Sequence, residues 1–174
     1  MKTPILETER LILRPLSYRD VDALFLLFSN PNVMKHDSGY VMTDKREAKE
    51  YVEMSMRDTE SGIVWAFEEK GTGAFIGTGG IKYAGESSCA EVGLLIDERY
   101  WNQKYGSEAV KKIVEFAIQT LQFTYAYATT LPENHRSIRL LHRLGFRFYG
   151  WTNYYLYANR YVNGFIFIKS KYVA

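Results

Sequence analysis

The spacing of apolar residues changes along this chain, and the change is sharpest at one strand–loop–helix junction. Apolar residues are nearly continuous from Ala90 to Ile96, which is typical of a buried strand. A polar loop, DERYWNQKYGSE, follows directly. Beyond it, apolar residues recur at helical spacing on one face, at Ala109, Val110, Ile113, Val114, Ala117, Ile118 and Leu121. A chain that alternates the two periods in this way predicts a mixed α/β or α+β fold around one sheet.

The segments before this junction predict a strand, two helices and an antiparallel meander. Leu11 to Leu16 has a strand pattern. Ser17 and Asp20 form a capping-box pair that predicts a helix as far as Ser29. Asp44 and Glu47 begin a second helix, which ends near Asp58. The meander strands are expected at Val64–Glu69, Phe75–Tyr83 and Ala90–Ile96.

The segments after the junction predict a strand, a short helix and an aromatic hairpin. Tyr125–Thr130 is the expected strand, and Ser137–Leu144 is a helix ended by Gly145. Two strands, Phe146–Tyr157 and Phe165–Tyr172, then alternate aromatic and polar residues, and the pair Asn163–Gly164 predicts the turn between them. The whole pattern indicates a central mixed, mostly antiparallel sheet flanked by about four helices.

Length and composition narrow the class of protein. With 174 residues, 47% of them hydrophobic, residues 1–174 are expected to form a single domain. The net charge of +2 argues against nucleic acid or an anionic membrane as the main partner. One cysteine, Cys89, excludes an internal disulfide, and the longest apolar runs, such as Ala23 to Phe28, are far below the roughly 20 residues that span a bilayer. We therefore expect a cytoplasmic protein.

The loop Trp101–Gly106 is a candidate anion site. It leaves a strand and begins a helix, so several unpaired backbone N–H groups and the helix dipole point to one place, where they suit a pyrophosphate. An ordinary turn remains an equally good interpretation of the loop by itself. The chain lacks G-x-x-x-x-G-K-[ST], and no G-x-G-x-x-G follows a strand, which argues against ATP and NAD.

Three segments stand out in succession along the chain: LETERLILRPLSYRDVDALF, AEVGLLIDERYWNQKYGSEAV and ENHRSIRLLHRLGF. In order and spacing they resemble successive motifs of the GCN5-related N-acetyltransferase (GNAT) superfamily, in its ribosomal-protein N-terminal acetyltransferase branch. The resemblance extends from Leu6 to about Gly164. It implies a GNAT-type fold, acetyl-CoA as cosubstrate and an amine as acetyl acceptor.

The resemblance also implies which residues bind acetyl-CoA. The strand before the loop would pair with the pantetheine arm through its backbone, the loop would cradle the pyrophosphate, and an asparagine would contact a pantetheine amide. These positions are Leu94, Leu95, Ile96, Gln103, Lys104, Tyr105, Gly106, Ser107 and Asn134. The chain departs from the family at Asn102 and Lys104, where glycines are usual. A positive φ at Lys104 would cost about 1–2 kcal/mol, which its ammonium could offset by facing a phosphate.

Two residues are implied as catalytic. Glu91 stands where related enzymes carry a carboxylate that accepts a proton from the attacking amine, although a solvent-facing or ion-paired strand carboxylate is the alternative. Ser137 could protonate the departing thiolate, because Leu141 occupies the position of the tyrosine that many family members use. An N-cap role for Ser137 is equally consistent with the sequence, and water could serve as the acid.

The expected reaction is acetyl transfer to a primary amine. An α-amine, with a pKa near 8, is more easily deprotonated than a lysine side chain, with a pKa near 10.4, so a peptide or protein N-terminus is the first candidate acceptor. A polyamine, aminoglycoside or amino acid is the alternative within the class, and an idle acyl-CoA-binding module is the alternative outside it. No metal is expected, because the three histidines lack ligand spacing. The late tyrosine-rich strands could line an acceptor groove or form a homodimer surface, and a half-exposed strand face is the alternative. Arg139 and Arg143 could reach the adenosine phosphates of the cosubstrate, but solvated helix charges are the commoner case, so they are left out of the expected site.

Overall fold

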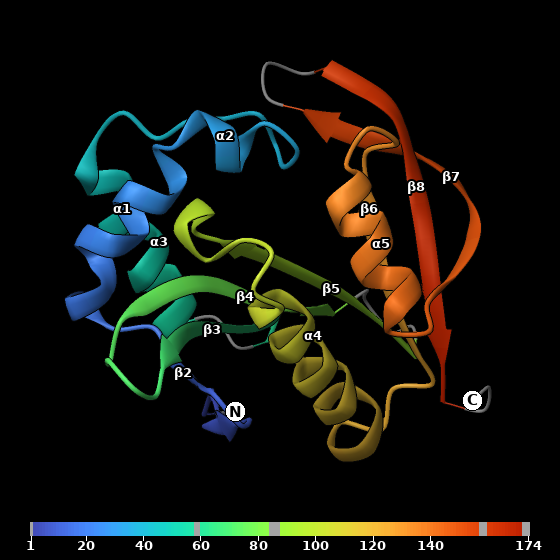
Figure 1. The fold of residues 1–174 in the computed structure, drawn as a ribbon, viewed down its shortest axis with the longest axis horizontal. Helices are drawn as coiled ribbons and strands as arrows, with labels where there is room; N and C mark the ends of the chain where they lie inside the picture. The colour runs from blue at the N-terminus through green and yellow to red at the C-terminus, as the bar shows by residue number, and fades with distance from the viewer. Residues whose placement is uncertain (1, 58–59, 84–87, 157–159, 172–174) are drawn as a thin grey trace.

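The computed structural model describes residues 2–57, 60–83, 88–156 and 160–171. Their strands form one eight-stranded sheet in the order β1-β2-β3-β4-β5-β6-β8-β7 (Figure 1). Strands β5 and β6 pair in parallel, and the other neighbouring pairs are antiparallel, which confirms the predicted mixed, mostly antiparallel sheet. The strands are β1 Leu6–Glu7, β2 Leu11–Pro15, β3 Gly62–Glu69, β4 Phe75–Tyr83, β5 Cys89–Ile96, β6 Tyr125–Thr130, β7 Arg147–Leu156 and β8 Arg160–Ser170.

Five α-helices accompany the sheet in the described residues, against the expected four or so. They are α1 Val21–Phe28, α2 Pro31–Met34, α3 Lys45–Arg57, α4 Tyr105–Glu115 and α5 His135–Arg143. Short 3₁₀ turns precede α1 at Tyr18–Asp20 and follow β5 at Glu98–Tyr100, and a π-helical turn, Phe116–Thr120, extends α4. The additional element is α2, since Asn30 ends the predicted first helix and at once caps another that has Pro31 at its first position.

Strand β3 shows why the helices lie on both faces of the sheet. Ile63, Trp65 and Phe67 belong to the main core, together with the apolar stripe of α4. Ala66, on the opposite face of the same strand, packs with residues of α1 and α3. Because successive strand residues point to opposite faces, one apolar strand buries both. In Figure 1, α4 and α5 lie in front of the sheet, and α1 and α3 lie at the left of the view.

The predicted turn at Asn163–Gly164 is wrong, although β7 and β8 do form an antiparallel pair. Asn163 pairs with Asn153, and Gly164 pairs with Thr152, both inside the ladder. A Cβ at Gly164 would lie 2.8 Å from the Cβ of Tyr154, so this glycine is explained by close packing within the strand. The connection itself falls at 157–159, outside the described residues.

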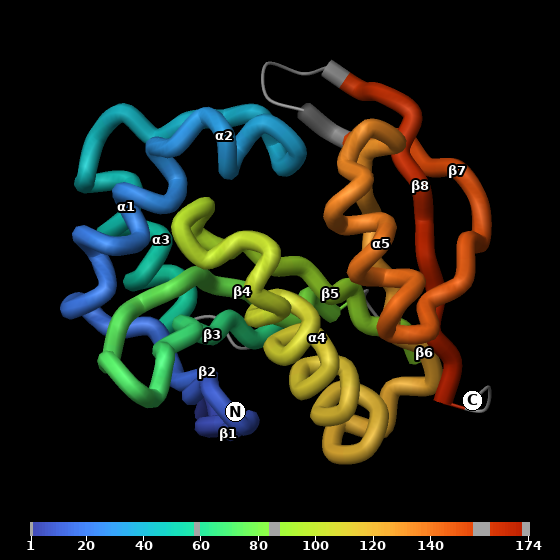
Figure 2. The backbone as a smooth tube through the Cα atoms, viewed as in Figure 1, coloured from blue at the N-terminus to red at the C-terminus, as the bar shows by residue number. Residues whose placement is uncertain are grey.

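Strands β5 and β6 separate partway along their length. Their ladder joins Cys89–Glu91 to Tyr125–Tyr127 and does not continue beyond Glu91 in the described strands. The segment after β5 then runs between α2 and α5 on its way to α4 (Figure 2). The separation leaves backbone groups on the later part of β5 available to a ligand. Within the residues described, no helix is long and apolar enough to cross a membrane.

Candidate active site

Two adjoining pockets open where β5 and β6 separate. The first has a volume of about 450 Å³ and the second about 340 Å³. Four predicted site residues line both of them: Leu94, Leu95, Asn134 and Ser137. We call the second the loop pocket, because residues 101–107 form much of its wall, and the first the Glu91 pocket. An elongated ligand could therefore extend from one into the other.

The loop before α4 has a left-handed backbone at the two positions where the resemblance leads one to expect glycine. Asn102 and Lys104 have φ values of 62° and 66°, in the left-handed region. Lys104 therefore stands at a positive-φ position, where it is the N-cap of α4 without a side-chain cap bond. The N-terminus of α4 consequently faces the loop pocket, whose lining includes Lys104, Tyr105, Gly106 and Ser107.

The loop pocket is cationic. Its lining holds Lys104, Arg136, Arg139 and Arg143 and contains no aspartate or glutamate. The Arg136 guanidinium stacks 4.1 Å from the centre of the Trp101 ring, and Arg143 Nη1 donates to Ser107 Oγ at 3.2 Å. Arginines beside a helix N-terminus suit a phosphorylated ligand. Arg139 and Arg143 are exposed, as expected of solvated helix charges, and they also line this pocket together with Arg136.

The loop is tied to the N-terminal segment by a carboxylate on α4. Glu108 accepts hydrogen bonds from Thr8 Oγ1, from the Arg10 backbone N–H at 2.8 Å and from Arg10 Nε at 2.8 Å. Arg10 also donates to the Gln103 carbonyl oxygen and covers the Tyr105 ring. Gln103 itself is not among the residues lining the loop pocket, and its side chain donates to the Arg99 carbonyl.

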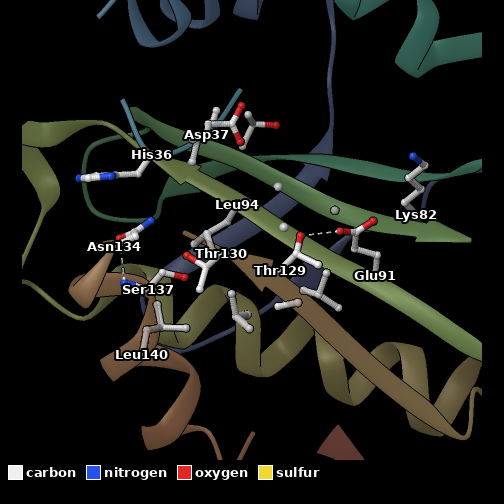
Figure 3. A pocket seen from close by; sticks show the side chains of 18 of the residues that line it. His36, Asp37, Lys82, Glu91, Leu94, Thr129, Thr130, Asn134, Ser137 and Leu140 are labelled. Atoms are coloured by element: carbon white, nitrogen blue, oxygen red, sulfur yellow. Dashed lines mark hydrogen bonds between the residues drawn. The ribbon is translucent and has the colours of Figure 1, made fainter. Parts of the chain in front are cut away.

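Glu91 lies in the middle of the cleft, held by two hydroxyl groups. Ala90 and Val92 are buried in the core, so Glu91 points to the other face of the sheet and into its pocket. Thr129 Oγ1 donates to Glu91 Oε1 at 3.0 Å (Figure 3). The Tyr127 hydroxyl lies 3.5 Å from Oε2. Burial and the neighbouring Glu91 raise the pKa of Tyr127, so its phenol stays protonated and donates. The carboxylate is therefore oriented, and Oε2, whose contact with Tyr127 is long, has a lone pair left to accept a hydrogen bond from an amine.

The start of α5 separates the two roles that Ser137 could play. Asn134 is the N-cap, and its side-chain oxygen accepts from the Ser137 backbone N–H at 3.2 Å. The helix begins at His135, two residues before the predicted start, so the N-cap role suggested for Ser137 is wrong. The Ser137 side chain instead lines both pockets (Figure 3).

The Glu91 pocket has a different character from the loop pocket. Asp37, Tyr51 and Tyr154 come from the α2–α3 segment, α3 and β7, and Lys82 comes from β4. Burial, with a smaller effect of Asp37, raises the pKa of Tyr51 to about 12, and the same causes raise that of Tyr154 further. Both phenols are therefore hydrogen-bond donors at neutral pH. A third, open pocket continues from Asp37, Glu91 and Tyr154 across the sheet toward Tyr149.

Several of these residues carry no local signal in the sequence. Thr129, Tyr127 and Asp37 reach Glu91 or its pocket only through the fold, from positions 36 to 54 residues away along the chain. Trp65 on β3 is fully buried and donates to the Pro4 carbonyl, so it does not line either pocket. In the described part of the chain, no group of three or more His, Cys, Asp or Glu residues is arranged to hold a metal ion.

The fold and cleft define an acetyltransferase of the GNAT class. The sequence profile described as "Acetyltransferase (GNAT) domain" matches residues 10–147. The chain belongs to this family and is an acetyl-CoA-dependent acetyltransferase.

Relatives and solved structures agree with this assignment. The uncharacterized N-acetyltransferase YoaA of Bacillus subtilis (strain 168) is 32% identical over 162 residues, which cover 90% of each chain. The acetyltransferase (GNAT family) of Bacillus anthracis superposes with a TM-score of 0.86 at 21% identity, covering 96% of this chain and 98% of that one. The spermidine N-acetyltransferase of Vibrio cholerae, solved with CoA and spermine, has a TM-score of 0.82 at 17% identity and covers 94% and 97%. The two structural likenesses concern the fold alone.

Proposed function

We propose that the chain acetylates a primary amine whose reacting ammonium is its one positive charge within the site, with a peptide or protein N-terminus as the first candidate. The observation that carries this proposal is Glu91, a carboxylate held by Thr129 in a pocket that adjoins the cationic loop pocket. An amine must lose a proton before it can attack, and a positioned carboxylate accepts it directly or through one water.

The loop pocket would hold the phosphates of acetyl-CoA. Lys104, Arg136, Arg139 and Arg143 would supply cations, and the start of α4 from Lys104 to Ser107 would supply N–H groups. Leu94, Leu95 and Ile96 would pair with the pantetheine arm through backbone groups that β6 leaves free, and Asn134 would contact an amide of that arm. The sequence resemblance implied the same assignment of strand, loop and Asn134 to the parts of acetyl-CoA.

In the reaction, the amine nitrogen attacks the thioester carbon, a carbon–nitrogen bond forms and the carbon–sulfur bond breaks. Glu91 takes a proton from the amine, and backbone N–H groups of β5 stabilise the oxyanion. Ser137, or a water molecule beside it, returns a proton to the thiolate. Thr129 positions Glu91 for the first of these steps.

The charge balance of the acceptor side favours a monocation. Two carboxylates, Asp37 and Glu91, face one lysine, Lys82, in the combined lining of the Glu91 pocket and the open pocket beyond it. With Glu91 engaged by the reacting amine, Asp37 alone would remain for further ammonium groups. A polyamine, the second candidate, would therefore be poorly neutralised, whereas an uncharged peptide body could contact the tyrosines of the open pocket.

The test is thiol release from acetyl-CoA with a panel of amines. The matched pair is a peptide with a free N-terminus and the same peptide with its N-terminus blocked and a lysine retained; spermidine, an aminoglycoside and free amino acids complete the panel. We expect turnover with the free N-terminus and little with the blocked peptide, because lysine deprotonation costs about 3 kcal/mol more. A preference for spermidine would overturn the choice of acceptor, and acetyl-CoA binding without turnover on any amine would favour an idle module.

We also propose that the reaction takes place in the cytoplasm, where acetyl-CoA is available. Membership of the ribosomal-protein branch and a homodimer remain predictions, which acetylation of ribosomal proteins and light scattering would check.

A further inference from the structure

Two buried side-chain polar atoms in the described residues have no hydrogen-bond partner, and both belong to the lining of the Glu91 pocket. They are Thr130 Oγ1 and His36 Nδ1. Thr130 is 2% exposed, so its hydroxyl is withdrawn from bulk water without a protein partner in exchange. Such a group costs about 1–3 kcal/mol of folding free energy. His36 lines the loop pocket as well, whereas Thr130 lines the Glu91 pocket and not the loop pocket. An unpaired hydroxyl in a pocket wall points to a ligand that pairs with it.

The position of Thr130 indicates which part of a ligand reaches it. Thr130 ends β6, on the stretch that has already separated from β5. It lines the Glu91 pocket and is absent from the lining of the cationic loop pocket. Figure 3 shows its hydroxyl oxygen on the side toward Asn134 and Ser137, two residues that belong to both pockets. A molecule with its phosphates in the loop pocket would bring its opposite end past these residues to Thr130.

We propose that Thr130 binds acetyl-CoA directly, its hydroxyl donating a hydrogen bond to the carbonyl oxygen or the sulfur of the thioester end. This rests on the proposed function, because the phosphates must occupy the loop pocket for the thioester to lie here. The hydroxyl is then unpaired in the free protein and paired in the complex. Thr130 is thus a binding residue that lowers the stability of the free protein and raises the affinity for its substrate.

A second buried threonine provides a matched control. Thr78 is also 2% exposed and also lines the Glu91 pocket, but its hydroxyl donates to the Trp65 carbonyl at 2.8 Å. Replacing either threonine by the isosteric valine removes one buried hydroxyl. Only at Thr78 does the change break a hydrogen bond of the free protein.

The experiment measures thermal unfolding of the free protein and calorimetric binding of two ligands, acetyl-CoA and adenosine 3′,5′-bisphosphate, which lacks pantetheine and thioester. For Thr130→Val we expect an unfolding temperature no lower than wild type, acetyl-CoA affinity weakened about 3- to 10-fold and unchanged bisphosphate affinity. Thr130→Ser, which keeps the hydroxyl, should restore acetyl-CoA affinity. Thr78→Val should lower the unfolding temperature by a few degrees without a comparable loss of affinity.

Wild-type acetyl-CoA affinity in Thr130→Val would overturn the proposal, as it would mean that water or the acceptor satisfies this hydroxyl. An equal loss of bisphosphate affinity would also overturn it, because the change would then act on the whole site. These readouts do not depend on turnover, so an enzyme that failed to acetylate any amine would refute the proposed function while the binding result would still decide the role of Thr130.

Discussion

The two adjoining pockets of the cleft are built in different ways. The loop pocket uses the backbone of one continuous segment, residues 101–107, and cations spaced along one helix, α5. The Glu91 pocket gathers side chains from β4, β5, β6, β7, α3 and the α2–α3 segment. In the proposed function, the first arrangement would bind phosphates through geometry that a short motif can specify. The second would select the acceptor, through chemistry that depends on how distant elements pack.

The largest expected effect is a loss of turnover from a change in the Glu91 pocket that leaves acetyl-CoA binding intact. Glu91→Gln removes the proton acceptor but keeps the shape of the side chain and its hydrogen bond from Thr129, so kcat should fall at least about 100-fold. Acetyl-CoA affinity should stay at the wild-type value, because Glu91 is absent from the lining of the loop pocket. Steady-state kinetics and calorimetry measure both quantities. Full activity in this variant would exclude Glu91 as the base.

The next prediction concerns the loop pocket. Its loop is held by the contact between Arg10 and Glu108, which are 98 residues apart in sequence. Burial by itself would raise the pKa of Glu108, but hydrogen bonds from Thr8 and Arg10 outweigh it, and the pKa lies below its ordinary value. Glu108→Gln should lower the free energy of unfolding at pH 7 by about 1–2 kcal/mol, toward the low end because Arg10 is 37% exposed. Denaturant titration measures the loss.

The same pair has a defined pH dependence. A carboxylate with a lowered pKa in the folded state stabilises the protein above its unfolded-chain pKa of about 4.3, and this contribution is lost as the pH falls through the folded-state value. The stability difference between wild type and Glu108→Gln should therefore shrink below pH 4. Glu115→Gln on the same helix, where the ion pair with Lys111 is exposed, should change stability by less than about 0.5 kcal/mol at any pH. A constant difference between wild type and Glu108→Gln would contradict the assignment.

The smallest expected effects come from Lys104, where two substitutions distinguish the cost of the positive φ from the contribution of the ammonium charge. Lys104→Gly should raise the free energy of unfolding by about 0.5–1 kcal/mol, since glycine adopts the observed positive φ without strain. It should also weaken acetyl-CoA binding about 3-fold by removing a cation from the pocket lining. Lys104→Ala, which loses the charge but keeps the strain, should show the weaker binding without the gain in stability. Equal stability of the two variants would indicate that the strain at Lys104 is negligible.

The fold was largely predictable because its signals are local. The changes in the spacing of apolar residues, from strand-like to helical and back, located most of the strands and the long helices. The predicted capping pair Ser17–Asp20 is present in the structure. The turn at Asn163–Gly164 failed because a glycine that avoids Tyr154 in a strand looks identical in sequence to a glycine in a turn. The same ambiguity affected Ser137, since both it and Asn134 are good N-cap residues and only the chain path selects between them.

By itself, the sequence determined the class of protein, the candidate residues along β5 and the departure from glycine at Lys104, because each follows from a contiguous motif. Only the tertiary structure decided that Thr129 and Tyr127 orient Glu91, that three arginines of α5 face the loop, and that the Thr130 hydroxyl is buried without a partner. These relations join residues far apart in the chain, or depend on which face of an element is buried. They are set by the packing of the sheet against its helices, and no local pattern encodes them.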